Sequence, residues 1–488
     1  MSHRSLLFMA SWIGQFLVVL ANEYEPVVSC TSLQAPEVPG ATVLNLSAKE
    51  ITSNGVKVCD VNVYITHGDA ADKVRIQTYL PLKEYKGRFQ GLGGGGMVAG
   101  NFDEALSGPA GQGFATGSTD AGRPNAKIAD DTWAGDDQLL RNFAYLSVHE
   151  MTVVGKSLAA QFYGQPVDYS YWNGCSNGGR QGYEEVQRYP GDYDGVLANA
   201  PGVNWDRFLV ADLFPYLVEV WEREFPPVCV WETITAASIS ACDELDGGKD
   251  GVINDPFQCK FDARSTVGDT ACNTTITEKH ARMWNRITEG PRDPNNSQLW
   301  GGLIPGTNFT SLAASRPFAI ARAWFAGFVE GNANFSIANI GRDAFLTQFY
   351  KSQAKFKCVM GADNPDISAF RDAGGKLLTW HGLVDQLIPV YGTIDYRLRV
   401  EGHLGGNEAV NSFYRFFLAP GVDHCGLGIG AEPTDPLQQL MDWVENGTAP
   451  EVMPATGEVG QRNLCLFPKK LRYTGDGDHA DASSWACV

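Results

Sequence analysis

Ser176 stands at the centre of a pattern that is typical of nucleophilic serines. Residues 174–178 read Gly-Cys-Ser-Asn-Gly, and Gly-x-Ser-x-Gly places a serine on a tight, strained turn between a strand and a helix. Such a turn accepts only small residues two positions on either side of the serine. The hydroxyl is then exposed at a helix N-terminus, where the helix dipole and free N–H groups favour developing negative charge. The pattern also arises by chance in a chain with 54 glycines, so the elements around it decide its meaning.

A serine nucleophile needs a base and a carboxylate that orients the base, and after this type of turn they follow in the order serine, acid, histidine. We expect His424 to be the base, because it lies in a loop just after a predicted strand. We expect Asp385 to be the acid, because it follows the preceding predicted strand. Asp423 is the nearest alternative acid, although a residue adjacent to His424 would reach its Nδ1 poorly. His381 is the alternative base, although it lies at the strand end that should present the acid.

Acyl transfer also needs two N–H donors for the oxyanion. One is expected from the backbone of Asn177, directly after the serine. The other is expected from the run Gly93–Gly96, at Gly94 or Gly95, because glycine lets the backbone approach a ligand closely. The alternatives are a flexible loop or a phosphate cradle. No Gly-Lys-Ser/Thr follows the run, which disfavours the phosphate interpretation.

Two cysteines flank these residues. If Ser176 and His424 meet, Cys175 and Cys425 become neighbours and should form a disulfide in an oxidising compartment. Such a bridge would restrict the motion of the nucleophile relative to the base. The chain has 11 cysteines, so one is unpaired or is paired outside the chain. No Cys-x2-Cys pair exists, which disfavours zinc.

The remaining cysteines are predicted less fully. Four more are expected in disulfides, namely Cys30, Cys59, Cys465 and Cys487. The sequence leaves open the pairing of Cys229, Cys272 and Cys358.

Short apolar runs that alternate with helix-like stretches must position the residues described so far. The serine turn lies between a predicted strand and a predicted helix, as the nucleophile pattern requires. The alternation is typical of an α/β fold. The predicted strands are 88–92, 113–120, 169–172, 194–200, 375–380 and 413–418, and the predicted helices are 142–163 and 178–189.

The strand–helix alternation is lost between residues 205 and 359 and then returns. The simplest account is one α/β domain in two parts, 22–204 and 360–488, interrupted by the insertion 205–359. Insertions of this kind usually lie over an active site as lids.

The first 21 residues are predicted to be a cleaved secretory signal. Arg4 supplies the positive start, residues 6–20 are mostly apolar, and Ala21 ends a small-residue cleavage site. A membrane anchor is the alternative, but the apolar run is short and is interrupted by polar residues. Export agrees with six Asn-x-Ser/Thr glycosylation motifs, at Asn45, Asn273, Asn295, Asn308, Asn334 and Asn446.

The charge balance excludes one class of partner. The formal net charge is −18, and no basic run or basic patch interleaved with aromatics occurs, so binding to nucleic acid is not expected. No later apolar stretch is long enough to span a membrane.

The pattern Cys175-Ser176, Asp385 and His424-Cys425 resembles that of the tannase and feruloyl esterase family. Further similar stretches are 93–96, 178–182, 193–195, 200–201 and 380–382, and the likeness runs from Cys30 to Cys487. The resemblance implies an α/β-hydrolase fold with a lid inserted between the sixth and seventh core strands. It also implies the Ser–His–Asp triad, the Cys175–Cys425 disulfide, and esters of hydroxycinnamic or gallic acid as substrates.

An acidic loop in the insertion is a second candidate site. Asp243, Asp246 and Asp250 fall within eight residues among turn-forming glycines. Their repulsion would disfavour a compact loop unless a cation neutralised it, and hard oxygen ligands indicate calcium. The alternative is a solvated acidic turn. The family resemblance implies a structural calcium ion, with backbone carbonyls from Gly248 and Val252 as further ligands.

A disulfide between Cys242 and Cys259 is expected to close this acidic loop. For catalysis itself no cofactor is expected.

These features predict a secreted serine esterase that hydrolyses esters of ferulic-type acids, such as those on plant cell-wall polysaccharide. One alternative is a tannase acting on galloyl esters, or a hydrolase of another aromatic ester. The alternative of a different class is a non-catalytic protein that binds phenolics or glycans on a hydrolase scaffold.

Overall fold

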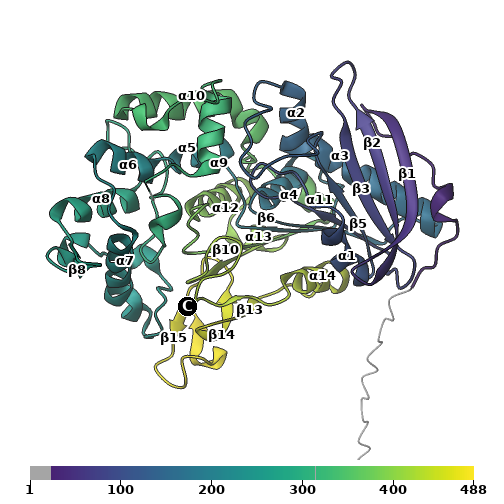
Figure 1. Cartoon of the computed structure of the whole chain (residues 1–488). Coiled ribbons are helices and arrows are strands. Elements are labelled where there is room, and N and C mark those ends of the chain that lie inside the picture. Colours follow the sequence, from purple (N-terminus) through teal and green to yellow (C-terminus); the bar gives the residue numbers. More distant parts are fainter. Residues whose placement is uncertain (1–22, 314) are drawn as a thin grey trace, which may run out of the picture.

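The structure, a computed structural model, describes residues 23–313 and 315–488 (Figure 1). The predicted signal sequence at 1–21 lies outside the described residues. Within the described ranges, no helix combines the length and the apolar character needed to cross a membrane.

A nine-stranded mixed sheet lies at the centre of the molecule, in the order β1-β2-β3-β5-β4-β6-β7-β10-β11. The strands from β1 to β3 and on to β5 pair antiparallel, whereas every pairing from β5 to β11 is parallel. Parallel strands end at the same edge of a sheet, so the loops after β4, β6, β10 and β11 gather there. The strand bounds are β1 Thr42–Ser53, β2 Val56–Thr66, β3 Val74–Pro81, β4 Arg88–Leu92, β5 Phe114–Thr119, β6 Tyr169–Cys175, β7 Gly195–Asn199, β10 Lys376–Gly382 and β11 Tyr414–Ala419.

Helices cover both faces of this sheet. On one face α3 (Ser147–Tyr163), α4 (Asn177–Arg188) and α12 (Tyr391–Leu404) share a buried apolar cluster with the strands. On the other face α14 (Pro436–Asn446) packs on β6, β7 and β10, and α1 (Glu104–Gly111) packs on β2 and β3. This is the α/β-hydrolase arrangement, and it confirms the predicted fold class.

The elements predicted around the serine are present with small changes of bounds. The strand predicted at 169–172 continues to Cys175 as β6, and the helix predicted at 178–189 is α4. The helix predicted at 142–163 begins with a π-helical turn, Asn142–Leu146, before α3.

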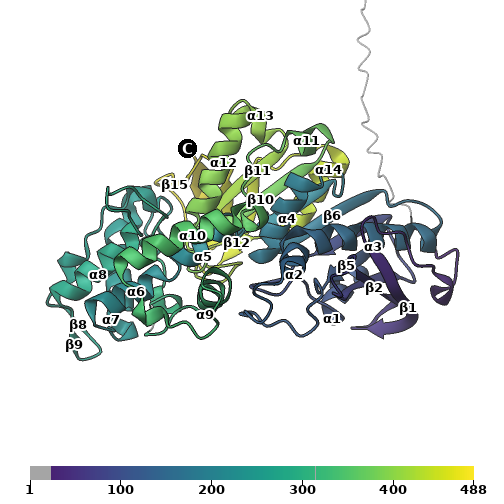
Figure 2. The same cartoon turned by 90° about the horizontal axis from the view of Figure 1, so that it is seen from above.

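The chain between β7 and β10 forms a mostly helical insertion. Counted from β2, these are the sixth and seventh strands, because β1 is a further strand at the sheet edge. Figures 1 and 2 both place α6, α7 and α8 to one side of the sheet. The helices are α5 (Trp205–Ala211), α6 (Phe214–Glu222), α7 (Val228–Cys242), α8 (Glu278–Glu289), α9 (Ala319–Ala323), α10 (Arg342–Met360) and α11 (Ser368–Asp372), and β8 (Thr270–Ala271) pairs with β9 (Thr274–Thr275).

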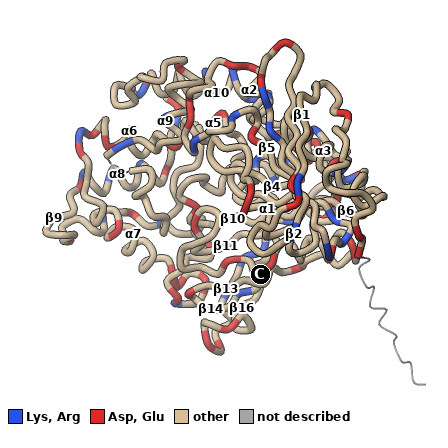
Figure 3. Tube along the Cα trace, turned by 45° about the vertical axis from the view of Figure 1, so that its right-hand side comes forward, with Lys and Arg blue, Asp and Glu red and all other residues tan. Residues whose placement is uncertain are grey.

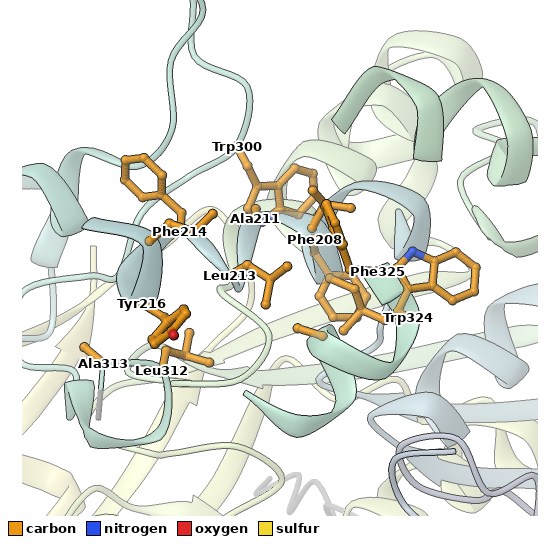
Figure 4. Packing of buried hydrophobic residues seen from close by; sticks show 14 of the residues in the cluster. Phe208, Ala211, Leu213, Phe214, Tyr216, Trp300, Leu312, Ala313, Trp324 and Phe325 are labelled. Carbon is orange, nitrogen blue, oxygen red and sulfur yellow. The ribbon is translucent and has the colours of Figure 1, made fainter. Parts of the chain in front are cut away.

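The insertion has an apolar core of its own that continues towards the loops of the main sheet. Figure 4 shows Phe208, Leu213, Phe214 and Trp324 packed together in this cluster. Because Phe208 belongs to both this core and the cavity described below, the packing of the insertion sets one wall of that cavity.

Smaller elements complete the chain. Two short helices, α2 (Asp137–Arg141) and α13 (Asn407–Asn411), precede core elements. The C-terminal segment adds two small sheets. One consists of β12 (Glu432–Pro433), β13 (Val452–Gly457) and β14 (Gly460–Cys465), and the other of β15 (Leu471–Tyr473) and β16 (Trp485–Cys487). Figure 3 shows acidic and basic positions interspersed along the core and the insertion.

Candidate active site

Ser176 occupies the sharp turn between β6 and α4. Its backbone has φ +63° and ψ −122°, a conformation that costs a non-glycine residue energy and persists only where the surroundings enforce it. The Ser176 N–H donates to the Asn199 carbonyl at 3.0 Å, and the Gly202 N–H donates to the Ser176 carbonyl at 3.1 Å. These bonds tie the turn to the last residue of β7 and to the chain that follows it.

The glycines of the motif are required by close backbone contacts. A Cβ at Gly174 would collide with the carbonyl group of Gly178, and a Cβ at Gly178 would press on the Gly93–Gly94 backbone. The sequence pattern therefore marks a place where two turns touch without side chains between them.

Asp385 and His424 are joined by a hydrogen bond of 2.8 Å between Oδ2 and Nδ1. The other carboxylate oxygen of Asp385 accepts the backbone N–H groups of Leu387 at 2.9 Å and Ile388 at 2.8 Å. Burial alone would raise the pKa of Asp385, but the charge of His424 and the hydrogen bonds from His381 and His424 outweigh it and lower that pKa. The carboxylate is thus held ionised, as an orienting acid requires.

His381, the alternative base, lies behind this carboxylate. Its side chain is fully buried, and its Nε2 is 3.1 Å from Asp385 Oδ2. His424 keeps some exposure and lines a cavity together with Ser176. Of the two imidazoles, His424 is the one that faces the serine's cavity.

Asp423, the alternative acid, is not the partner that the structure gives to His424, because Asp385 occupies the Nδ1 position. Burial and the nearby charge of Asp385 raise the pKa of Asp423, and His424 opposes this.

Cys175 and Cys425 form a disulfide with their Cα atoms 5.9 Å apart. The bridge joins the residue before Ser176 to the residue after His424 across 250 positions of sequence. The other bridges are Cys30–Cys59, Cys229–Cys272, Cys242–Cys259 and Cys465–Cys487. Cys358 is the free cysteine left by the odd count, and it is exposed.

Ser176 and His424 open into a cavity of about 680 Å³, a size that suits a small organic ligand. Trp205, Phe208 and Leu209 of α5 contribute to its wall, and none of them was predicted as a site residue. Their place at the start of the predicted insertion was the only signal in the sequence. The other lining residues are Leu92, Gly93, Gly94, Gly95, Gly96, Val98, Asn101, Ala105, Ile128, Asn173, Gly174, Cys175, Phe318, Ile320, Leu387, Ile388 and Cys425.

The predicted oxyanion donors differ in availability. Asn177 begins α4, so its N–H lies among the donors that a helix leaves unpaired at its N-terminus. Gly94 was an expected donor, but its N–H donates to Gln181 Oε1 at 3.1 Å, so it is not free for an oxyanion. Among the hydrogen bonds of the described residues, none uses the Gly95 N–H. Of the two glycines predicted as the second donor, Gly95 is the one that keeps an uncommitted N–H among the described residues.

Two side chains of α4 hold this region together; they lie in the stretch 178–182 that resembles the family, but no role was predicted for either of them. Gln181 accepts the Gly94 N–H and donates to the Ala99 carbonyl at 2.8 Å, which clamps the glycine loop to the helix. Arg180 is fully buried and donates to Asn177 Oδ1 at 2.9 Å and to the Ala144 carbonyl at 2.7 Å. Burial lowers the pKa of Arg180 to about 10.

The acidic loop of the insertion is pinned by its own backbone. Asp243 accepts the N–H groups of Asp250 and Gly251, and Asp246 accepts those of Gly248 and Asn254. Burial raises the pKa of both Asp243 and Asp246.

The side chain of Asp250 pairs with Arg462 at 2.6 Å. Within the described residues, no group of three or more acidic, histidine or cysteine side chains is arranged to hold a metal ion. The donor chemistry suits calcium, the side-chain arrangement does not assemble a full site, and the calcium site stays a prediction.

All six asparagines of the predicted glycosylation motifs are exposed, at positions 45, 273, 295, 308, 334 and 446. Exposure is a condition for modification and leaves glycosylation itself a prediction.

Comparisons with known proteins show which family the chain belongs to. The family model described as tannase and feruloyl esterase matches residues 57–488. A probable feruloyl esterase of Arthroderma benhamiae is 40% identical over 502 residues, covering 94% of this chain and 93% of the relative. The chain belongs to the tannase and feruloyl esterase family. It is a carboxylic ester hydrolase, and the resemblance noted in the sequence is confirmed.

Further members of the tannase and feruloyl esterase family match over most of their length. Feruloyl esterase B of Aspergillus niger is 32% identical over 481 residues, covering 91% of this chain and 90% of the relative. The crystal structure of feruloyl esterase B from Aspergillus oryzae has a TM-score of 0.82 at 27% identity, covering 93% of this chain and 98% of that one. A tannin acyl hydrolase from Aspergillus niger has a TM-score of 0.83 at 25% identity, covering 93% of each chain.

Proposed function

We propose that this chain is a serine esterase that hydrolyses esters of hydroxycinnamic acids, with Ser176 as nucleophile, His424 as base and Asp385 as orienting acid. The observation that carries the proposal is that the hydrogen-bonded pair Asp385–His424 opens into the same apolar cavity as the strained serine turn. The disulfide between Cys175 and Cys425 supports it, because it holds the two turns together.

The mechanism proceeds in two steps. His424 removes the proton from Ser176 Oγ as the oxygen attacks the ester carbonyl, while Asp385 stabilises the charged imidazole. The backbone N–H groups of Asn177 and Gly95 receive the oxyanion of the tetrahedral intermediate. His424 then protonates the leaving alcohol, and water activated by the same imidazole releases the acid from the acyl-enzyme.

The character of the cavity wall favours a ferulic-type acyl group over a galloyl group. The insertion contributes mainly apolar surface to the wall, from Trp205, Phe208, Leu209, Phe318 and Ile320, with the indole N–H of Trp205 as the one polar side-chain group among these residues. A galloyl ring carries three phenolic hydroxyls, and each one buried without a partner costs about 1–3 kcal/mol. A feruloyl ring carries one hydroxyl and one methoxy group, so it suits this wall better.

Apart from Ser176 and His424, the polar side chains of the core that line the cavity are Asn101, in the loop between β4 and α1, and Asn173 of β6. Amide groups there suit the hydroxyls of an alcohol such as a sugar. The proposed orientation is therefore the aromatic acyl group against the insertion and the alcohol towards Asn101 and Asn173.

The test compares wild type with Ser176→Ala on methyl ferulate, methyl caffeate and methyl gallate, together with labelling by a fluorophosphonate. We expect turnover of methyl ferulate that exceeds that of methyl gallate, and loss of both turnover and label in Ser176→Ala. Turnover mainly of methyl gallate would favour the tannase alternative. Binding of phenolics without label or turnover would favour a non-catalytic protein.

Secretion is proposed as well. Five disulfides in one chain are typical of an oxidising compartment. The exposure of all six glycosylation asparagines supports the same location. N-terminal sequencing of protein recovered from culture medium tests it, since a cleaved signal gives a start near Asn22.

A structural calcium ion in the acidic loop is the last proposal. Asp243, Asp246 and Asp250, with carbonyls of Gly248 and Val252, would hold it, and their oxygen donors match the preference of calcium. The raised pKa values of Asp243 and Asp246 support it, because a cation would offset the cost of two buried carboxylates. Elemental analysis of the purified protein, with Asp246→Asn as the comparison, should find about one calcium per chain in wild type only.

A further inference from the structure

His381 is a second imidazole on the catalytic carboxylate, and nothing in the proposed mechanism uses it. Its side chain is fully buried, and it does not line the cavity that Ser176 and His424 share. It lies at the end of β10, four residues before Asp385.

The hydrogen bonds of His381 determine where its proton lies. Nε2 is 2.9 Å from the carbonyl oxygen of Ile388 and 3.1 Å from Asp385 Oδ2. A carbonyl oxygen only accepts hydrogen bonds, so Nε2 must carry a hydrogen. Nδ1 is 2.9 Å from Thr393 Oγ1, and the threonine hydroxyl donates to it when the ring is neutral.

The same side chain therefore closes the loop that carries the catalytic acid. From the end of β10 it reaches both Asp385, at the start of the loop, and Ile388, three residues further on. Leu387 and Ile388 donate back to the other oxygen of Asp385. The loop is thus held at the carboxylate and at the residues that line the cavity.

We propose that His381 is a positioning residue for the esterase reaction, which shares its single Nε2–H between the Ile388 carbonyl and Asp385 Oδ2 and so sets the orientation and the basicity of the carboxylate that His424 uses. This inference rests on the proposed roles of Ser176, His424 and Asp385. Asp385 Oδ2 receives two imidazole donors. The bond from His381 stabilises the carboxylate and so limits how strongly Asp385 favours the charged form of His424.

Other ionisable groups face this pair and belong to the same balance. Asp423, next to His424, is half-buried, and burial with the charge of Asp385 raises its pKa. Asp212, between α5 and α6, is buried, and burial with the charge of Asp385 raises its pKa well above the usual range. The groups that lower the pKa of Asp385 are His424 and His381.

The experiment compares His381→Met with His381→Gln, because the two side chains have similar size and only glutamine has an N–H donor at its end. In His381→Met we expect kcat on methyl ferulate to fall about 10- to 100-fold, the range for losing a hydrogen bond to a charged group. KM should stay within about twofold, because the residue does not touch the cavity. The acidic limb of the kcat/KM pH profile should move to higher pH, and His381→Gln should restore most of kcat.

Equal loss in His381→Met and His381→Gln would mean that the imidazole only fills space, and wild-type kcat and pH profile in His381→Met would overturn the proposal outright. If His381→Met does not fold, His381→Leu, which also lacks a donor, replaces it, and a wild-type kcat and pH profile in that variant has the same meaning. Failure of the proposed function would give a different result, because turnover of methyl ferulate would then be the same in Ser176→Ala as in wild type.

Discussion

Replacing both Cys175 and Cys425 by alanine removes the covalent link between the serine turn and the histidine loop. The bridge closes a loop of 250 residues, and the bridge between Cys465 and Cys487 closes one of 22 residues. Loop-closure entropy gives upper values of about 5.5 kcal/mol for the first and about 3.4 kcal/mol for the second. The first variant should therefore lose about 2 kcal/mol more of the free energy of unfolding.

The effect on catalysis separates the two bridges more sharply. Cys175 and Cys425 line the cavity, whereas Cys465 and Cys487 do not. A displacement of about 1 Å between reacting groups costs about 100-fold in rate, so kcat should fall up to this much in the Cys175→Ala/Cys425→Ala variant. In the Cys465→Ala/Cys487→Ala control, kcat should stay near the wild-type value.

The assay combines urea unfolding with turnover of methyl ferulate, at a temperature where both double variants are folded. The free thiol of Cys358 is present in every protein compared, so any effect that it has is the same in all of them. Two results would refute the reasoning: full kcat without the first bridge, or an equal loss of kcat in the control.

Three further predictions follow from buried contacts. Hydrogen bonding to Glu150, with a further contribution from Asp72 and against the cost of burial, raises the pKa of His67 to about 9. The contribution of this charged imidazole to the free energy of unfolding is therefore complete below about pH 6.5 and is lost as the pH rises through about 9. Urea midpoints should fall across that pH window more in wild type than in His67→Gln, and parallel curves would disprove this. Gly174→Ala should abolish turnover or folding, because its methyl group meets the Gly178 carbonyl; an active soluble variant would contradict the close contact. Phe208→Ala should raise KM for methyl ferulate and lower stability by about 3–5 kcal/mol; an unchanged KM would remove Phe208 from the acyl wall.

The nucleophile elbow was predictable because its determinants are local. Gly174 and Gly178 permit the turn, an apolar run before it forms β6, and α4 follows at once. The order of Ser176, Asp385 and His424 along the chain was enough to predict that they lie near one another, because each follows a strand that belongs to one parallel set. Local backbone preferences and strand order were therefore sufficient to predict this part of the site.

Other features depend on tertiary contacts that no local sequence pattern predicts. Gly94 and Gly95 are equivalent in sequence, and only the position of Gln181 shows that the first has its N–H engaged. The aromatic wall from α5 was missed because burial against the insertion core gives Trp205 and Phe208 no distinctive spacing. The edge hairpin of β1 and β2 was not predicted, because its outer strand is largely exposed and lacks a continuous apolar run.

By itself the sequence determined the family, the α/β-hydrolase core, the serine turn and the expectation that Cys175 pairs with Cys425. Only the tertiary structure decided that His381 lies behind Asp385 while His424 faces the cavity, and that the N–H of Gly94 is taken up by Gln181. The physical reason is the distance along the chain between the residues that interact. A turn or a strand is set by residues a few positions apart, whereas the direction of an imidazole or the freedom of an amide depends on segments brought together from distant parts of the chain.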